Sequence, residues 1–536
     1  MATQTIDLTD TNQVYFNGNE CDHVYLNYIK IWSKNSVLKI NETKQTAGNY
    51  FTLTINSSKT WDGTLYYRTR TITPGQPNST YVWSDWAQVT TGLSIQFGIV
   101  TAGNSFIDTM EVYGVGNTGV CTNSSISSKK LWSLSGITGT PEISMEGNLL
   151  ALLDTSLVIS TVRQRAFQAL FQDWTILKTL PTIEASINLS NYSLYRTFYG
   201  CTGISRVTSV RVNSYGANCC SQMFYNCSGI SSPAYFYALG QGVLFGNNCF
   251  EKTFYGCTNI TSLNYLPVYP FVNLSGECGS NVFRYMFQAC TGLTTVSSNI
   301  FLSVNSLSEG CFSGLFSGCS SLITPPNLPS NVSLTNSCYN SMFYGCTSLT
   351  SAPSLPATTL AEGCYRAMFQ NCTSLTNAPS LPATTLATSC YYNMFYGCTS
   401  LTSAPSLPAT TLAEDCYRAM FQDCTSITNA PSLPATTLAP TCYFYMFKGC
   451  TSLTSIPYLP ATVLARSCYG YMFYGCSNIC ISDTQDTTYI NALYIPPEPS
   501  ANSGSVSFMF TDTGGSFTGT PLFDTTYYTS NTIISS

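Results

Sequence analysis

The chain has 536 residues, and with 44% apolar and 13% aromatic residues it is too hydrophobic to be disordered. Only 9% of the residues are charged, and 21 Lys and Arg against 26 Asp and Glu leave a net charge of −5. No basic stripe is available to neutralise phosphates or anionic lipids, so nucleic-acid binding is not expected. Membrane insertion is not expected either, because no stretch approaches the ~18 apolar residues of a membrane span.

Residues 1–118 alternate apolar or aromatic with polar side chains at a period of two, most clearly at 50–55 and 65–71. Clusters of Gly, Asn, Pro and Ser separate these segments, and the combination predicts an antiparallel β-sandwich. Trp83 and Trp86 are candidates for stacking on sugars. The alternative is that both tryptophans belong to the core of the sandwich and its rim.

Residues 119–159 are expected to form a linker and the N-terminal cap of a repeat region that begins at residue 160. The stretch 116–128 is rich in Gly, Asn and Ser, which is typical of a linker.

From residue 160 the chain repeats itself. Six cysteines recur at intervals of 26 residues, and a second series follows each of them by eight. Residues 338–389 and 390–441 differ at only seven of 52 positions, which indicates a recent duplication. Looser copies precede them, so about twelve coils are expected over 160–480. The first series is Cys338, Cys364, Cys390, Cys416, Cys442 and Cys468, and the second is Cys346, Cys372, Cys398, Cys424, Cys450 and Cys476.

Each repeat unit contains a short segment with the spacing of an inward-facing strand. Leu349, Ala352 and Leu355 follow one another at three-residue intervals. Pro353 and Pro356 lie beside them, and since proline cannot donate to a ladder, a strand there holds only about three residues. One unit cannot bury these side chains by itself, so the units must stack.

A second apolar stripe comes later in the same unit. Cys364, Met368 and Cys372 recur every four residues, which predicts one stripe of a short helix or of successive helical turns. Phe369 widens this stripe, and Leu375 lies just after it. These five residues are the predicted structural core of a coil.

The 25 cysteines leave three interpretations open: a disulfide ladder, a metal array or buried thiols. Cysteines eight apart on a helix lie ~12 Å apart, whereas a disulfide needs Cα atoms within ~7 Å. Pairing between adjacent coils stays geometrically possible. Cys-x2-Cys zinc knuckles are missing, and Cys476 and Cys480 are the nearest approach. We therefore favour reduced thiols that act as small apolar fillers, and expect no metal or other cofactor.

The run at 390–413 reads Cys-Tyr-x-x-Met-Phe-x-Gly-Cys-Thr-Ser-Leu-Thr-x-Ala-Pro-x-Leu-Pro-Ala-Thr-Thr-Leu-Ala. It resembles the BspA-like leucine-rich repeats of Bacteroidetes surface proteins and of phages that infect those bacteria. The likeness is specific over 338–476 and recognisable over 160–337. Residues 145–153 are similar to the segment that often precedes such repeats, although Ala151 replaces its serine. The resemblance implies a right-handed solenoid used in adhesion or surface display, without catalysis.

The complete expectation for the fold is mainly β with short helices: a β-sandwich followed by a BspA-like leucine-rich-repeat solenoid. Residues 481–536 are expected to form a degenerate last repeat, around Phe508, and a C-terminal cap. An uncapped solenoid would expose both its core and a strand edge.

Catalysis is not expected. The only histidine, His23, would have to serve any triad, zinc site or general base, and beside Asp22 it is more simply a surface pair. Glycoside cleavage would need two opposed carboxylates. The acids of the repeats lie mostly at equivalent coil positions, which makes a ladder on one surface and not a facing pair. They include Glu362, Glu414, Asp415 and Asp423.

Recognition is expected to use the positions that vary between coils. Tyr, Arg and Asn, which are common at interfaces, recur at the two positions after the first Cys-Tyr pair. Neutral drift on an exposed face is the alternative. The candidate residues for a ligand or partner face are Asn340, Arg366, Tyr392, Arg418, Phe444, Tyr445 and Tyr471.

Family members on the bacterial surface usually carry a secretion or lipoprotein leader, and the first residues here resemble neither. The leading hypothesis is therefore a non-enzymatic phage virion protein, a head or tail fibre or decoration, made in the host cytoplasm. It would contact host surface polysaccharide or protein, dock to other virion proteins through residues 1–118 and form a homo-oligomer. The alternatives are a bacterial cell-surface adhesin of the BspA-like type and, from a different class, a capsule depolymerase.

Overall fold

The computed structural model describes residues 37–74, 80–121, 130–154, 162–238, 245–269, 279–302, 304–330, 332–498 and 503–534, and the backbone of four short strands before them. It divides into two compact units. Unit 1 is Met1–Cys257 with Pro267–Pro270, and unit 2 is Thr258–Leu266 with Phe271–Ser536.

Two short antiparallel hairpins come first in unit 1. β1 (Val14–Phe16) pairs with β2 (Asn19–Cys21), and β3 (His23–Leu26) pairs with β4 (Ile29–Ser33). The predicted pair of His23 and Asp22 lies outside the residues whose side chains are described.

A ten-stranded sheet comes next, and seven of its strands follow the order β12-β6-β10-β11-β5-β13-β14. β7 also pairs with β11, and β8 and β9 each pair with β7. Its buried face is apolar, because alternate side chains of β5 and β6 point inward. The strands are β5 (Leu38–Glu42), β6 (Asn49–Ile55), β7 (Thr64–Thr73), β8 (Thr80–Trp83), β9 (Ala87–Gln88), β10 (Ser94–Ile99), β11 (Phe106–Val115), β12 (Trp132–Thr138), β13 (Ile143–Gly147) and β14 (Leu177–Thr179).

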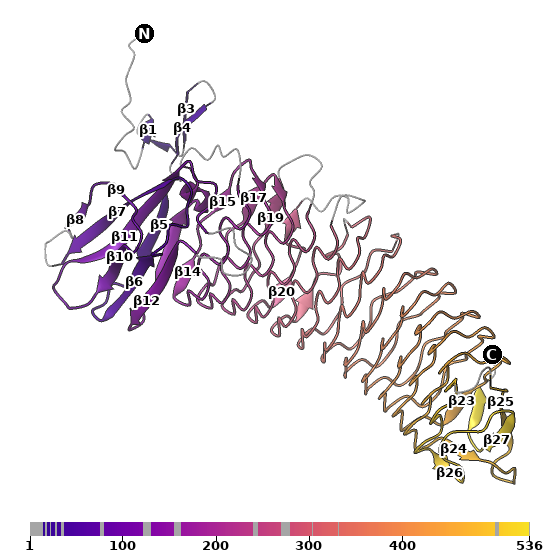
Figure 1. Cartoon of the computed structure of the whole chain (residues 1–536). Helices are drawn as coiled ribbons and strands as arrows, with labels where there is room; N and C mark the ends of the chain where they lie inside the picture. The colour runs from indigo at the N-terminus through magenta and orange to yellow at the C-terminus, as the bar shows by residue number, and fades with distance from the viewer. Residues whose placement is uncertain are drawn as a thin grey trace. The chain divides into compact units, whose positions relative to one another are not determined.

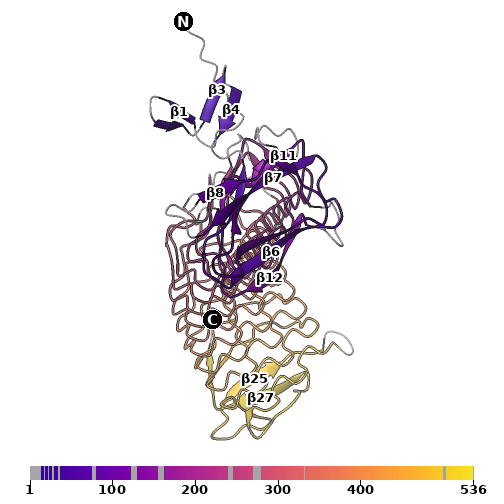
Figure 2. The same ribbon diagram turned by 90° about the vertical axis from the view of Figure 1, so that its left-hand side faces the viewer.

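This sheet is single, curled and mixed, so the predicted antiparallel sandwich of two sheets is wrong. β11 pairs with β7 along one edge and with β10 and β5 in turn along the other. β11 therefore joins two sets of strands, β7–β9 on one side and β10, β6 and β12 on the other, into one sheet. This sheet curls so that β6 and β12 lie across from β7 and β8 (Figure 2). The pairs β10–β11 and β13–β14 are parallel.

β12 and β13 come from the segment that the sequence assigns to a linker and cap. After β13 the chain forms η1 (Leu149–Leu152), a 3-10 turn whose four residues are fully buried. Asn148 caps it: its Oδ1 accepts from the Leu150 amide (3.0 Å), and its Nδ2 donates to the Glu184 carbonyl (2.7 Å).

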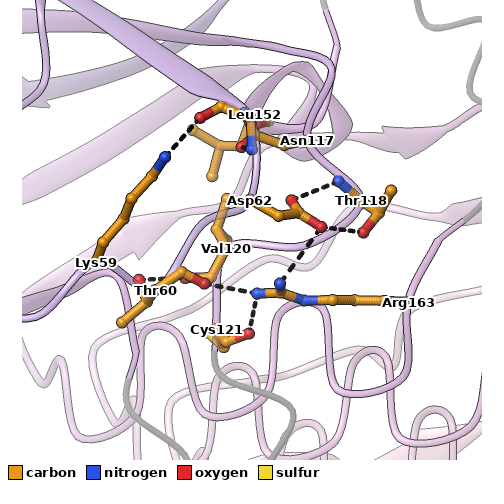
Figure 3. A network of polar contacts seen from close by, with 10 residues as sticks. Lys59, Thr60, Asp62, Asn117, Thr118, Val120, Cys121, Leu152 and Arg163 are labelled. Carbon is orange, nitrogen blue, oxygen red and sulfur yellow. Dashed lines mark hydrogen bonds and ion pairs between the residues drawn. The ribbon is translucent and has the colours of Figure 1, made fainter.

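A polar network joins the loop after β6, the loop after β11 and the first coil (Figure 3). The Asp62 carboxylate accepts hydrogen bonds from the amide and hydroxyl of Thr118 and lies 3.4 Å from Arg163 Nη1. Arg163 also donates to the carbonyls of Thr60 (2.6 Å) and Cys121. Burial by itself raises the pKa of Asp62, but the Thr118 hydrogen bonds and the Arg163 charge outweigh burial and lower that pKa.

The coils of both units are built on segments that we call turn runs. A turn run is the ten residues that end at a second-series cysteine, such as 363–372, or at the equivalent cysteine of an earlier coil, such as Cys257, Cys290 or Cys319. Successive backbone amides of a run donate hydrogen bonds alternately to a carbonyl of the same run and to a carbonyl of the next run. Met368 N donates to Tyr365 O within the run (3.3 Å), whereas Phe369 N donates to Met394 O of the next run (3.0 Å). Adjacent runs are thus hydrogen-bonded along their whole length, and Figure 1 shows the resulting stacked coils.

The predicted short helices are wrong, because the turn runs are not helical. Every fourth residue has a positive φ, as at Gly363 (+56°), Ala367 (+51°) and Asn371 (+61°), and a right-handed helix contains no such residue. In the described part of the chain η1 is the only helix. A four-residue period with two side chains in and two out imitates the 3.6-residue period of a helix, which explains the wrong prediction.

The core of the coils consists of columns of identical side chains. In one coil Cys364, Met368, Phe369, Cys372 and Leu375 are all fully buried. Phenylalanine rings stack 5.7 Å apart between coils from Phe343 to Phe473, and tyrosine rings stack 5.8–6.0 Å apart from Tyr339 to Tyr469.

The strands of the coils are short and parallel. In unit 1, β15 (Ile183–Glu184), β17 (Val210–Val212), β19 (Phe236–Ala238) and β21 (Val268–Tyr269) form one sheet, and β16 (Asn188–Leu189) pairs with β18 (Ser214–Tyr215). In unit 2, β20 (Ser262–Leu263) pairs with β22 (Thr295–Val296).

The regular coils bury the expected leucines without forming the expected strand. Leu349 and Leu355 are buried and Ala352 is half-buried, but the described coils over 338–454 hold only single parallel bridges, such as Thr359 with Thr385. The two prolines in each such segment remove the donors that a ladder requires.

The last residues of unit 2 return to the coils. β28 (Thr532–Ile534) pairs in parallel with β23 (Ser455–Pro457) of an earlier coil. Asn531 Nδ2 donates to the Thr454 (3.0 Å) and Asn478 (2.9 Å) carbonyls. Phe510 stacks on Phe473 at 6.0 Å, so the final run continues the ring column. A four-stranded sheet completes this end: β25 (Asn491–Ile495), β27 (Thr525–Thr529), β24 (Cys480–Ser482) and β26 (Gly514–Gly515).

Candidate functional site

Six of the seven residues predicted to form a ligand or partner face meet in unit 2. Within a turn run the first Cys-Tyr pair and the subsequent Met-Phe pair point into the core. The two residues between them lie nearer the surface, except for the small Ala367, Ala419 and Gly470, which are buried. Arg366 is exposed, and the other five are half-buried. We call the surface formed by these residues, with Lys448, Tyr474 and Phe508, the turn face.

Arginines and rings alternate along the first part of the turn face. The Arg366 guanidinium lies 4.6 Å from the Tyr392 ring centroid, and the Arg418 guanidinium lies 5.4 Å from Tyr392 and 4.9 Å from Phe444. Asp415 holds Arg418 through a 3.2 Å ion pair. Four successive coils are therefore linked by cation–π contacts, each worth about 0.5–1 kcal/mol at an exposed site.

An aromatic cluster lies beyond this part, toward the C-terminus. Between ring centroids, Phe444 lies 4.2 Å from Tyr445, and Tyr445 lies 4.9 Å from Tyr471. The Tyr471 centroid in turn lies 5.9 Å from that of Tyr474 and 4.9 Å from that of Phe508. Phe508 is 48% exposed. Five rings thus form a continuous, partly exposed surface.

Lys448, Tyr474 and Phe508 were not among the predicted site residues. Lys448 Nζ lies 4.8 Å from the Tyr445 ring and 5.4 Å from the Tyr474 ring. Tyr474 comes directly after Phe473 in its run just as Lys448 comes after Phe447, and both positions become visible once the four-residue period is recognised.

Asn340 stands apart from the ring and arginine contacts of the turn face. Its Oδ1 accepts a hydrogen bond from the Ser341 hydroxyl (2.7 Å).

Trp83 and Trp86 flank an arginine. The Arg68 guanidinium lies 4.5 Å from the Trp83 ring and 4.7 Å from the Trp86 ring, and Arg68 Nε donates to Glu111 (2.8 Å). Glu111 is fully buried and also pairs with Lys39 (3.3 Å). The two tryptophans therefore cover a buried ion pair with one face each, and sugar stacking on them stays a prediction.

The cysteines of the second series are hydrogen-bond donors as well as fillers. Cys398 Sγ donates to Phe369 O (3.0 Å), and Cys424 Sγ donates to Phe395 O (2.9 Å). Burial raises the pKa of Cys398 to about 12, so the thiol keeps its proton at neutral pH. No cysteine of the described coils is disulfide-bonded. Sequence reasoning missed this S–H donation, because no residue pattern marks the carbonyl that accepts it.

Within the described ranges, no three His, Cys, Asp or Glu side chains gather as a metal site would require. Two neighbouring acids of the coils have separate partners: Asp415 pairs with Arg418, and Glu414 lies 4.0 Å from Arg466. Among these same residues, no helix has both the length and the apolar character needed to cross a bilayer.

Comparison with known families identifies the repeats. Residues 280–428 and 414–493 match the BspA type leucine rich repeat region, in six copies. The chain therefore contains a BspA-type leucine-rich-repeat region over 280–493, a type that typically serves surface adhesion or binding and is generally non-enzymatic. No enzyme family was found, and the match does not support a phage origin. Neither curated proteins nor solved structures gave a match.

Proposed function

We propose that this protein is a non-enzymatic surface-binding protein whose turn face contacts a polysaccharide or protein on a bacterial cell. One observation carries the proposal. Of the seven differences between residues 338–389 and 390–441, five lie in turn runs, at 340/392, 341/393, 363/415, 371/423 and 389/441. The other two are Leu375/Ile427 and Thr388/Pro440, so the Cys, Tyr, Met and Phe columns are unchanged while the turn-run residues between them differ.

The rings of the turn face are not needed for folding. Where one coil has Phe444 and Tyr445, an equivalent coil has Asn340 and Ser341, with the same buried columns and the same hydrogen bonds between runs. Partly exposed rings that the fold does not require are typical of binding surfaces, where aromatic residues are enriched.

For location we retain two hypotheses, the virion surface and the bacterial cell surface. On the virion hypothesis, residues 1–118 dock to other virion proteins and the protein is a homo-oligomer. Probing purified virions and washed cell envelopes for this chain separates the two hypotheses, because each predicts the protein in only one fraction.

Binding of the labelled full-length protein to intact Bacteroidetes-type cells tests the turn face. The variant Phe444→Asn with Tyr445→Ser copies the pair at 340–341, so it should fold normally, and we expect cell binding to fall at least tenfold. The control, Thr358→Ala with Thr384→Ala, changes exposed side chains elsewhere on the coils and should bind like the parent protein. Unchanged binding by the first variant would refute the proposal.

The capsule depolymerase remains the alternative of a different class. Incubating the protein with purified capsule separates it from binding alone, since a steady release of reducing ends would show an enzyme.

A further inference from the structure

The repeat spacing of unit 2 is irregular just before the regular coils begin. In the regular coils a second-series cysteine precedes the next first-series cysteine by 18 residues, as from Cys346 to Cys364. The interval is 21 residues from Cys290 to Cys311 and 19 from Cys319 to Cys338. Two neighbouring coils therefore carry three extra residues and one extra residue, and insertions in repeat proteins often form binding loops.

A cavity of about 430 Å³ lies between the two longer segments, lined by residues from 298–305 and from 327–332. A backbone hydrogen bond connects the two segments: the Asn327 backbone N–H donates to the Ser298 carbonyl (3.2 Å). The volume falls in the lower part of the ~300–1,000 Å³ range of small-molecule sites. The site therefore suits a small ligand or one end of a longer chain.

The lining has two kinds of side chain. Asn299, Asn305 and Asn327 contribute amides, which both donate and accept hydrogen bonds. Phe301, Val304 and Leu328 contribute an apolar wall, in which Phe301 and Val304 are buried. None of the eleven lining residues, all of them described, is ionisable. A charged ligand would lose part of its hydration there without gaining a counter-charge.

We propose that this cavity binds a neutral carbohydrate, either a free monosaccharide or a terminal residue of a neutral glycan. Hydroxyl groups on such a ring match the amides, and its C–H face matches the apolar wall. The site is separate from the turn face, so it adds a second specificity to the surface binding proposed above and does not depend on that proposal.

Titration of the full-length protein with matched sugars tests this assignment. Glucose and glucuronate, and galactose and galacturonate, differ only at C6, where the acid has a carboxylate in place of the hydroxymethyl group. Binding is followed by saturation-transfer NMR and calorimetry. We expect at least one neutral sugar to bind at least tenfold more tightly than its acid. A neutral oligosaccharide that binds more tightly than its monosaccharide would identify a glycan end as the ligand, and equal affinity would identify the free sugar.

Two tryptophan variants locate the site. Ser298 and Ser354 both lie eight residues after the cysteine that ends a turn run, Cys290 and Cys346, but only Ser298 lines the cavity. Ser298→Trp should abolish sugar binding, whereas Ser354→Trp and the turn-face variant should leave it unchanged. The assignment is overturned if no neutral sugar or neutral oligosaccharide binds, if the acids bind equally well, or if Ser354→Trp causes the same loss. The two proposals fail separately: if the turn-face variant still binds cells like the parent protein, only the turn-face proposal is refuted, and the sugar titrations still test the cavity.

Discussion

Glycine, asparagine and aspartate alternate at the last left-handed position of the regular turn runs. Asn371, Gly397, Asp423 and Gly449 occupy this position in four successive coils, with φ between +59° and +73°. A Cβ on Gly397 would lie 2.4 Å from Asn371 Oδ1, whereas a Cβ on Gly345 would meet no atom closer than 3.9 Å. The left-handed φ accepts asparagine and aspartate as well as glycine, so at Gly397 it is the side-chain amide of Asn371 in the preceding coil that excludes a Cβ.

This difference gives a prediction for two matched substitutions. Gly345→Ala and Gly397→Ala should each lose about 1–2 kcal/mol, because an alanine is strained at a left-handed φ. Gly397→Ala should unfold at the lower temperature of the two, since Asn371 must also move. Thermal unfolding followed by circular dichroism measures both midpoints, and equal midpoints would mean that the contact with Asn371 has no cost.

At the scale of elements, the contact between the curled sheet and the first coil depends on Arg163. Its guanidinium donates to the carbonyls of Thr60 and Cys121 and pairs with Asp62. The hydrogen bonds to the two carbonyls contribute more to stability than the ion pair does. Truncating Arg163 would leave both carbonyls without their charged donor, whereas the Asp62 carboxylate is 37% exposed and its ion pair is screened by water.

We therefore expect unequal losses from the two partners. Arg163→Ala should lower the free energy of unfolding by about 2–3 kcal/mol, and Asp62→Asn by about 0–1 kcal/mol. Denaturant titration measures both losses. Lys178→Ala is the control, since its 3.9 Å pair with Glu142 is exposed and should contribute little. Equal losses from Arg163→Ala and Asp62→Asn would contradict this assignment.

At the scale of the whole molecule, buried thiols recur through both units. Burial raises the pKa of Cys227 in unit 1 and of Cys346, Cys398 and Cys476 in unit 2 to about 12. In the unfolded chain such thiols ionise near pH 8.5. Between these values the unfolded state binds fewer protons than the folded state, so stability falls as pH rises.

The resulting prediction is a steep alkaline loss of stability. The stabilisation that the buried, protonated thiols provide is complete below about pH 8.5. As pH rises toward 12, the free energy of unfolding falls by up to about 1.4 kcal/mol per thiol and pH unit. Urea titrations at pH 7, 9, 10 and 11 measure it. A variant with Cys346, Cys398 and Cys476 changed to Ala should show a shallower slope, and identical slopes would show that these thiols do not titrate on unfolding.

The amino-acid sequence by itself determined the repeat, its 26-residue period and the residue types of its buried columns. These properties are visible because every coil repeats the same local pattern. It did not show that the second stripe is a run of turns, because a period of four and a period of 3.6 differ little over nine residues. Only the positive φ at Ala367 and Asn371 separates the two conformations, and neither residue type demands it.

Tertiary structure alone decided which distant residues meet. β11 joins the two halves of the first sheet through pairings that no local pattern encodes, so a sandwich and a curled sheet look alike in sequence. Arg366 and Tyr392 are 26 residues apart, and only the hydrogen-bonded stacking of turn runs brings them within 4.6 Å. The cavity over 298–332 likewise exists only because two longer segments from adjacent coils lie side by side and both line it.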